Sequence, residues 1–96
     1  MYFSSYYQRH TRVDAVREKY PTGKRVAITY YNGEHIKDGT GLATVKFVDD
    51  LGVIKVERDD GTIARIIPGI DTLRFLTDAE MSVEAEKRIV EREQQK

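Results

Sequence analysis

The sequence predicts a mainly β protein: a small five-stranded antiparallel barrel with a helix at each end. Apolar and polar residues alternate in five short runs between residues 25 and 76, which is the pattern of half-buried strands. Gly, Asp, Asn and Pro separate these runs at intervals of roughly eight to twelve residues, as in small barrels. The flanking segments show helical spacing instead. We divide the chain into an aromatic and basic N-terminal arm and helix over 1–19, the barrel over 20–76 and an acidic C-terminal helix over 77–96.

The N-terminal helix is predicted to begin at Thr11. Thr11 and Asp14 have the spacing of a capping box in which Asp replaces the usual Glu. Val13, Val16 and Tyr20 then share one helical face, which we expect to pack on the barrel. A proline and a glycine just after Tyr20 end the helix and turn the chain.

Five strands follow, and their side-chain alternation predicts which residues point inward. Val45 and Phe47 fall on the inward face of the second strand. Lys46 and, in the fourth strand, Arg65 fall on the outward face. Residues 32–41 are expected to form a polar loop rich in glycine. The strands are expected over residues 25–31, 42–48, 54–57, 62–67 and 72–76.

The C-terminal helix is predicted from a capping box and an apolar stripe. Thr77, with Glu80 three residues on, is a helix start, and the aspartate after Thr77 is an alternative cap. Met81, Ala85 and Ile89 form an apolar stripe on one face. Three partners remain open for this stripe: its own barrel, a second copy of the chain, or a foreign protein. The sequence favours a homodimer whose interface contains at least one of two segments, this stripe or the aromatic head.

The head of the chain combines aromatic rings with positive charge. Tyr2, Phe3, Tyr6 and Tyr7 lie in its first seven residues, and residues 1–25 hold six Lys and Arg against two acids. Two interpretations remain open. The head folds back and buries its rings on the small core, or it forms an aromatic and basic contact surface.

Composition excludes several protein classes. Sixteen Lys and Arg balance sixteen Asp and Glu, which argues against a protein held to nucleic acid by bulk charge. The absence of cysteine excludes disulfide scaffolds, thiolate metal sites and cysteine nucleophiles. There is no apolar run long enough to span a membrane and no apolar core of a signal peptide. We therefore expect a cytoplasmic protein.

A search for catalytic chemistry finds none. His10 and His35 lack the spacing of metal ligands, and we interpret both as surface residues. No serine has a neighbouring base, and no glycine-rich loop matches a phosphate cradle. Two pairs of adjacent carboxylates lie in predicted turns, where Asp is favoured for its hydrogen bonds to the backbone. These pairs are Asp49 with Asp50 and Asp59 with Asp60. We predict that the protein is not an enzyme and needs neither metal nor cofactor.

Five motifs in order carry a resemblance to a known family. They are Tyr20–Val26, Gly39–Val45, Val48–Ile54, Asp59–Thr62 and Ile67–Asp71. Over residues 16–76 the chain resembles the domain-of-unknown-function 4314 family, small bacterial proteins common on phages and conjugative elements. The resemblance implies an SH3-like barrel and the setting of a mobile element, but no function.

Two positions depart from the family pattern. Arg58 stands where the family tends to have a Trp before its Asp-x-Gly turn. Lys37, Asp38 and Gly39 stand where Pro-Pro-Gly is typical. If that Trp belongs to a shared binding surface, the ligand of this chain differs.

The predicted function is that of a small non-enzymatic binding or inhibitory module, an accessory or counter-defence protein of a mobile element. Its ligand would be a protein partner or an anionic group, which Arg binds through its planar fork and Tyr by stacking. The alternatives are a protein that sequesters a nucleotide or short nucleic acid, and a structural module that self-associates. The candidate contact residues are Tyr6, Tyr7, Arg25, Tyr31, Lys46, Lys55, Arg58 and Arg65.

Overall fold

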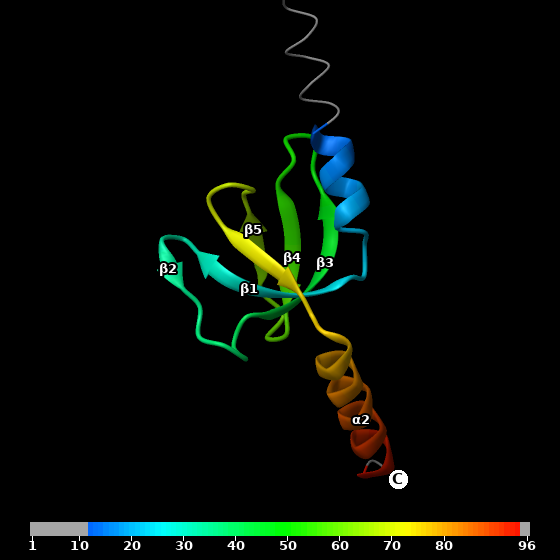
Figure 1. The fold of residues 1–96 in the computed structure, drawn as a ribbon. Helices are drawn as coiled ribbons and strands as arrows, with labels where there is room; N and C mark the ends of the chain where they lie inside the picture. Colours follow the sequence, from blue (N-terminus) through cyan, green and yellow to red (C-terminus); the bar gives the residue numbers. More distant parts are fainter. Residues whose placement is uncertain (1–11, 95–96) are drawn as a thin grey trace, which may run out of the picture.

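A curled antiparallel sheet forms the body of the protein, and a helix lies at each of its two ends (Figure 1). This computed structural model describes residues 12–94. A short helix covers 12–19, and α2 covers Asp78–Gln94. The strands are β1 (Arg25–Tyr31), β2 (Glu34–His35), β3 (Leu42–Val48), β4 (Ile54–Arg58), β5 (Ile63–Ile66) and β6 (Thr72–Phe75).

The strand order is β2-β1-β3-β4-β5, and β6 returns to pair with β1. Every pairing between strands is antiparallel. Ala27 in β1 pairs with Leu42 of β3 and also with Arg74 of β6. A strand held on both sides in this way lets the sheet curl into a half-barrel around its buried face (Figure 1).

Five strands lie where alternation predicted them, but the interpretation of residues 32–41 as a plain loop was wrong. This segment contains β2, in which Glu34 pairs with Tyr31. The chain reverses over Asn32 and Gly33, which have φ values of 53° and 83°. Two successive residues with positive φ make the tight turn that matches the twist of a hairpin, so a short strand follows.

Two β-bulges change the predicted directions of aromatic side chains. The register shifts between Ile28 and Tyr30 in β1 and between Val45 and Phe47 in β3. A bulge inserts one extra residue and so inverts the alternation beyond it. Phe47 is therefore outward and 55% exposed, against the prediction that it faces the core. Tyr31, predicted to be outward, packs against the core.

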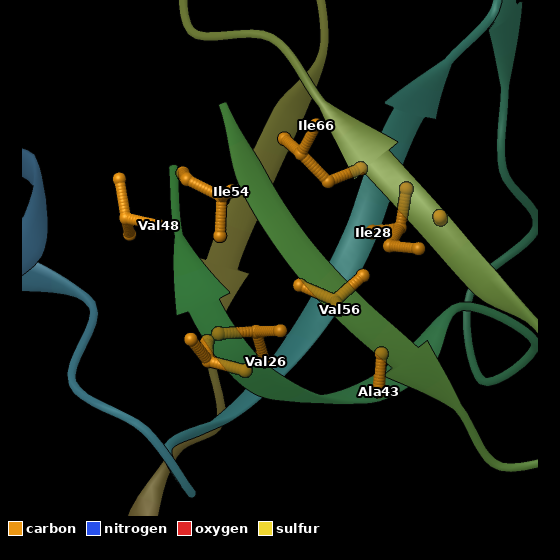
Figure 2. Packing of buried hydrophobic residues seen from close by; sticks show 9 residues of the cluster. Val26, Ile28, Ala43, Val48, Ile54, Val56 and Ile66 are labelled. Atoms are coloured by element: carbon orange, nitrogen blue, oxygen red, sulfur yellow. The ribbon is translucent and has the colours of Figure 1, made fainter. Parts of the chain in front are cut away.

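The core is a cluster of aliphatic side chains on the concave side of the sheet (Figure 2). Val45, Val56 and Ile66 are almost completely excluded from solvent. The helix over 12–19 closes one end of this core. Its Val13 is buried, and Val16 packs against the cluster, as predicted. No helix among the described residues is long and apolar enough to cross a membrane.

Candidate functional site

The paired aspartates act as structural acceptors. Asp49 accepts from the backbone N–H groups of Val53 and Leu51, both at 2.9 Å, and these bonds lower its pKa. Asp60 accepts from the hydroxyl and the backbone N–H of Thr62, which lower the pKa of Asp60. A general acid at neutral pH needs the opposite shift. Both residues therefore shape turns, as predicted.

The other member of each pair binds an arginine. Asp50 accepts from Arg17 at 2.7 Å, and Asp59 accepts from Arg25. Among the described residues, no three His, Cys, Asp or Glu side chains gather where they could hold a metal ion. His35 packs edge-on against Tyr30, with the ring centroids 5.0 Å apart, and His10 lies outside the described residues.

Arg25, predicted to be a ligand-binding cation, is the centre of a network of ion pairs within the chain. Its guanidinium donates to both carboxylate oxygens of Asp59 at 2.7 and 3.0 Å, and to Thr44 Oγ1 at 3.0 Å. It also donates to Glu84 of α2. The Arg25 side chain is 16% exposed and that of Glu84 19%. Arg25 therefore ties β1, β3, the β4–β5 turn and α2 together, and its bonds lower the pKa of Asp59.

The first turn of α2 has a second anchor. Glu80 accepts from Arg74 of β6 in a two-bond pair at 2.7 and 2.9 Å. Glu80 also accepts from the backbone N–H of Thr77 at 3.0 Å, while its own N–H donates to Thr77 Oγ1 at 3.2 Å. The capping box predicted from the sequence is therefore present, and its Glu also joins the helix to the sheet.

We predict that acid loosens the start of α2. The bonds from Arg74, followed by that from the Thr77 backbone, lower the pKa of Glu80 from 4.5 to about 2. A depressed folded-state pKa means that the stabilisation is complete above pH 4.5 and is lost as the pH falls toward 2. Carboxyl NMR during an acid titration should report this value and a simultaneous loss of helical signals at Thr77.

Arg74→Met is the matched variant for this titration. Removing the cation that favours the charged form should raise the pKa of Glu80 toward its ordinary value. Its helix signals should then change at higher pH than in the native chain. An unchanged pKa in Arg74→Met would show that the pair does not exist in solution.

Arg58 and Tyr31 form a second group, at one end of the barrel. Arg58 pairs in register with the fully buried Ala43, so its side chain lies on the inward side of the sheet. Its guanidinium carbon lies 5.0 Å from the centroid of the Tyr31 ring, in a cation–π contact. Arg58 Nε is buried without a hydrogen-bond partner in the described part of the chain. Arg58 and Tyr31 therefore help to close the barrel and do not share a face with the outward cations.

The remaining predicted cations gather on the convex side of β3, β4 and β5. We define the outer sheet face by its outward residues Lys46, Phe47, Lys55, Ile63 and Arg65. Lys55 lies directly across from Arg65 in β5 and pairs in register with Phe47 in β3. Phe47 and Ile63 are 55% and 57% exposed. This face combines three cations with exposed apolar side chains.

The acids near this face offset its cations only in part. Lys46 Nζ lies 3.2 Å from Glu57, and Lys55 Nζ lies 3.9 Å from Asp49. Arg65 forms no ion pair with any residue that the structure describes. The outer sheet face therefore keeps one exposed guanidinium beside a lysine of the same sign.

An open groove of about 630 Å³ lies between α2 and the barrel. Leu42, Leu76 and Val83 supply its apolar part, and Lys87 and Glu91 are among its charged residues. The groove carries both signs of charge in nearly equal number, so it does not select an anion. It differs in this respect from the outer sheet face.

Sequence reasoning grouped the candidate residues together, and the structure separates them. Lys46, Lys55 and Arg65 belong to the outer sheet face, whereas the Arg25 guanidinium is held by Asp59 and Glu84, and Arg58 lies on the inward side of the sheet. Tyr6 and Tyr7 lie outside the described residues. The apolar members of the face, Phe47 and Ile63, were missed. Phe47 is exposed because of the bulge in β3, and Ile63 is exposed because alternation places it on the outward side of β5. Only the direction of Ile63 could have been predicted from the sequence.

Comparison with known proteins places the chain in a family. A search among curated proteins finds none that matches it. A family model matches residues 9–76, which include every strand and the helix over 12–19. α2 and the aromatic head before residue 9 fall outside this match. The chain therefore belongs to the family described as Domain of unknown function (DUF4314).

Proposed function

We propose that this protein is a non-enzymatic binding module and that its outer sheet face holds an acidic segment of a protein partner. The observation that carries the proposal is the position of Lys55 directly across from Arg65 on adjacent strands. Like charges directly opposite each other on a sheet are destabilising. A bound carboxylate between the two cations would remove that repulsion.

Asp49, which forms an ion pair with Lys55, relieves the repulsion only in part. Asp49 lies 3.9 Å from Lys55 Nζ, beyond the distance of a strong charge-assisted bond. It already accepts two backbone N–H groups in its own turn. Arg65 is exposed and its fork is open to a carboxylate, which it can hold with two parallel bonds.

The exposed apolar side chains point to a protein and not to a nucleic-acid strand. Phe47 and Ile63 flank the cations on the same face, and apolar groups near charged ones are typical of a contact surface for protein. The chain has no net charge, whereas binding to nucleic acid draws on a clear excess of cations. An acidic segment with apolar side chains therefore fits this face best.

We extend the proposal to the fold type and to the biological setting. The order of β1, β3, β4 and β5 around a curled sheet, with β6 returning to β1, supports an SH3-like barrel. Members of the resembled family are common on phages and conjugative elements, and this association supports an accessory, counter-defence role on a mobile element. Genes of phage or conjugative origin beside this one would agree with that setting, and an isolated chromosomal position among housekeeping genes would contradict it.

The binding proposal predicts where a probe changes the NMR spectrum. A short peptide that alternates Glu and Phe should shift the amide signals of Phe47, Lys55, Ile63 and Arg65. Added salt should weaken this binding, because screening reduces exposed charge interactions. The double variant Lys46→Glu with Arg65→Glu should weaken it by about tenfold or more, because each lost charged hydrogen bond costs about 1.5–3 kcal/mol.

Arg88→Glu is the matched control, since it reverses an exposed cation of α2 that is not part of the outer sheet face. It should leave the peptide affinity unchanged. A short oligothymidine tests the nucleic-acid alternative on the same samples. If the oligothymidine shifts these signals and the peptide does not, the nucleic-acid alternative is favoured. If the double variant binds the peptide as tightly as the native chain does, the cations have no role in binding.

A further inference from the structure

α2 carries exposed apolar side chains that are not among those packed on the core. Met81 is 39% exposed, Ile89 is 56% exposed and Ala85 is exposed between them. We call these three residues the apolar stripe. The alternative that the stripe packs on its own barrel is therefore wrong. A lone helix of this length has marginal stability in water, so a covering partner would stabilise it.

The anchors of α2 determine which way the stripe faces. Glu80 and Glu84 bond to the barrel, and each precedes a stripe residue by one position. One position turns a helix by about 100°, so Met81 and Ala85 lie well around the helix from the anchored side. Figure 1 shows α2 extending away from the sheet, which leaves the stripe open to another molecule.

The charges of α2 change sign along its length. Residues 78–86 contain Asp78, Glu80, Glu84 and Glu86 and no cation. Residues 87–94 contain Lys87, Arg88 and Arg92 against Glu91 and Glu93. Two such helices attract each other when they run antiparallel, because each acidic half then lies beside the more basic half of the other.

We propose that α2 pairs with α2 of a second copy, antiparallel, about a two-fold axis at Ala85. Met81 and Ile89 lie four residues to either side of Ala85, so each Met81 meets an Ile89 of the second copy. Residues 78–84 of each copy, which are acidic, then stand level with residues 86–92 of the other, which include Lys87 and Arg88. The methyl group of Ala85 lets the two helices approach closely at the axis.

The same pattern argues against a parallel pair. Parallel helices would place the acidic residues 78–86 of the two copies side by side, and Lys87 and Arg88 beside the same residues of the second copy, so like charges would repel in both halves. A stripe with three members over about 12 Å of helix is smaller than a standard protein interface. We therefore expect a dimer of low affinity, which forms at high protein concentration.

Disulfide trapping tests this arrangement directly, because the native chain has no cysteine. Chains with Met81→Cys and chains with Ile89→Cys should cross-link to each other when mixed, and neither should cross-link efficiently by itself. Ala85→Cys should cross-link to its own copy. Lys87→Cys, on the opposite side of the helix, is the control and should stay monomeric under the same oxidation.

Light scattering at high micromolar concentration gives the second test. Met81→Asp with Ile89→Asp should weaken dimerisation by at least about tenfold, since it places charge in the apolar contact. Val83→Asp with Val90→Asp makes the same change on the other side of α2 and should leave the dimer intact. Circular dichroism checks that both double variants keep their helix.

The outcomes separate clearly. A native chain that is monomeric at high micromolar concentration overturns the proposal and leaves the stripe to a foreign partner. Cross-linking of Met81→Cys to its own copy overturns the antiparallel order. A dimer that survives Met81→Asp with Ile89→Asp overturns the stripe as its interface. None of these results would bear on the proposed function of the outer sheet face, since the two surfaces share no residue.

Discussion

Replacing Gly41 by alanine will destabilise the barrel by about 2–5 kcal/mol, because the new methyl group has no room and a strand hydrogen bond must move. A Cβ at Gly41 would lie 2.3 Å from the backbone oxygen of Ile28. The Gly41 oxygen accepts from the Ile28 N–H at 2.8 Å, so relieving the clash pulls this bond apart. Urea unfolding of the native chain and the variant measures the loss.

Gly39→Ala is the control for this result. Gly39 has a φ of 84°, and nothing lies within 4 Å of an added Cβ. Alanine there suffers only the strain of a left-handed conformation, about 1–2 kcal/mol. Gly41 has no positive φ, so an argument from backbone angles alone would rank the two variants in the opposite order. A larger loss in Gly39→Ala would show that β1 and β3 do not approach this closely.

Local patterns in the sequence predicted the strands and the capping box of α2 well, whereas the predicted helix start at Thr11 lies outside the described residues. β1 and β3 have the boundaries that alternation and turn residues indicated. The Thr77–Glu80 capping box forms as expected. These features depend on residues a few positions apart, and nearby sequence determines them.

The directions of Tyr31 and Phe47 could not be predicted, because each lies beyond a bulge. Nothing in the types of residues 29 or 46 marks an extra residue in the strand. A bulge forms where the pairing of whole strands requires it, and one extra residue then inverts every later side chain. The exposed aromatic of the candidate site arises in this way.

The ion pairs of the site could not be predicted from the sequence either. Arg25 and Glu84 are 59 positions apart in sequence, and Arg25 and Asp59 are 34 apart. On a chain with 32 charged residues, composition cannot tell which cation will be paired and which will be free. Arg25 was therefore expected to bind a ligand, whereas Arg65 is the candidate cation of the barrel that is exposed and forms no ion pair with a described residue.

Arg25→Met should destabilise the protein by about 2–3 kcal/mol and release α2 from its fixed position. Methionine keeps the apolar stem of the side chain but removes the charged hydrogen bonds to Asp59 and Glu84, each worth about 1.5–3 kcal/mol where water is largely excluded. We expect a loss at or below the lower end of the sum, because Asp59 is more than half exposed and water weakens its bond. Urea unfolding gives the energy, and residual dipolar couplings give the orientation of α2.

A double-mutant cycle with Glu84→Gln separates the link to the helix from the link to the turn. If Arg25 orients α2 through Glu84, the two changes together should cost less than the sum of their single effects, with a coupling of about 0.5–3 kcal/mol. Arg25→Lys should recover only part of the loss, because an ammonium cannot serve two carboxylates with a planar fork. Lys87→Met is the control on the same helix and should change little. Additive effects of Arg25→Met and Glu84→Gln, with α2 still fixed, would mean that Arg74 and Glu80 alone position the helix.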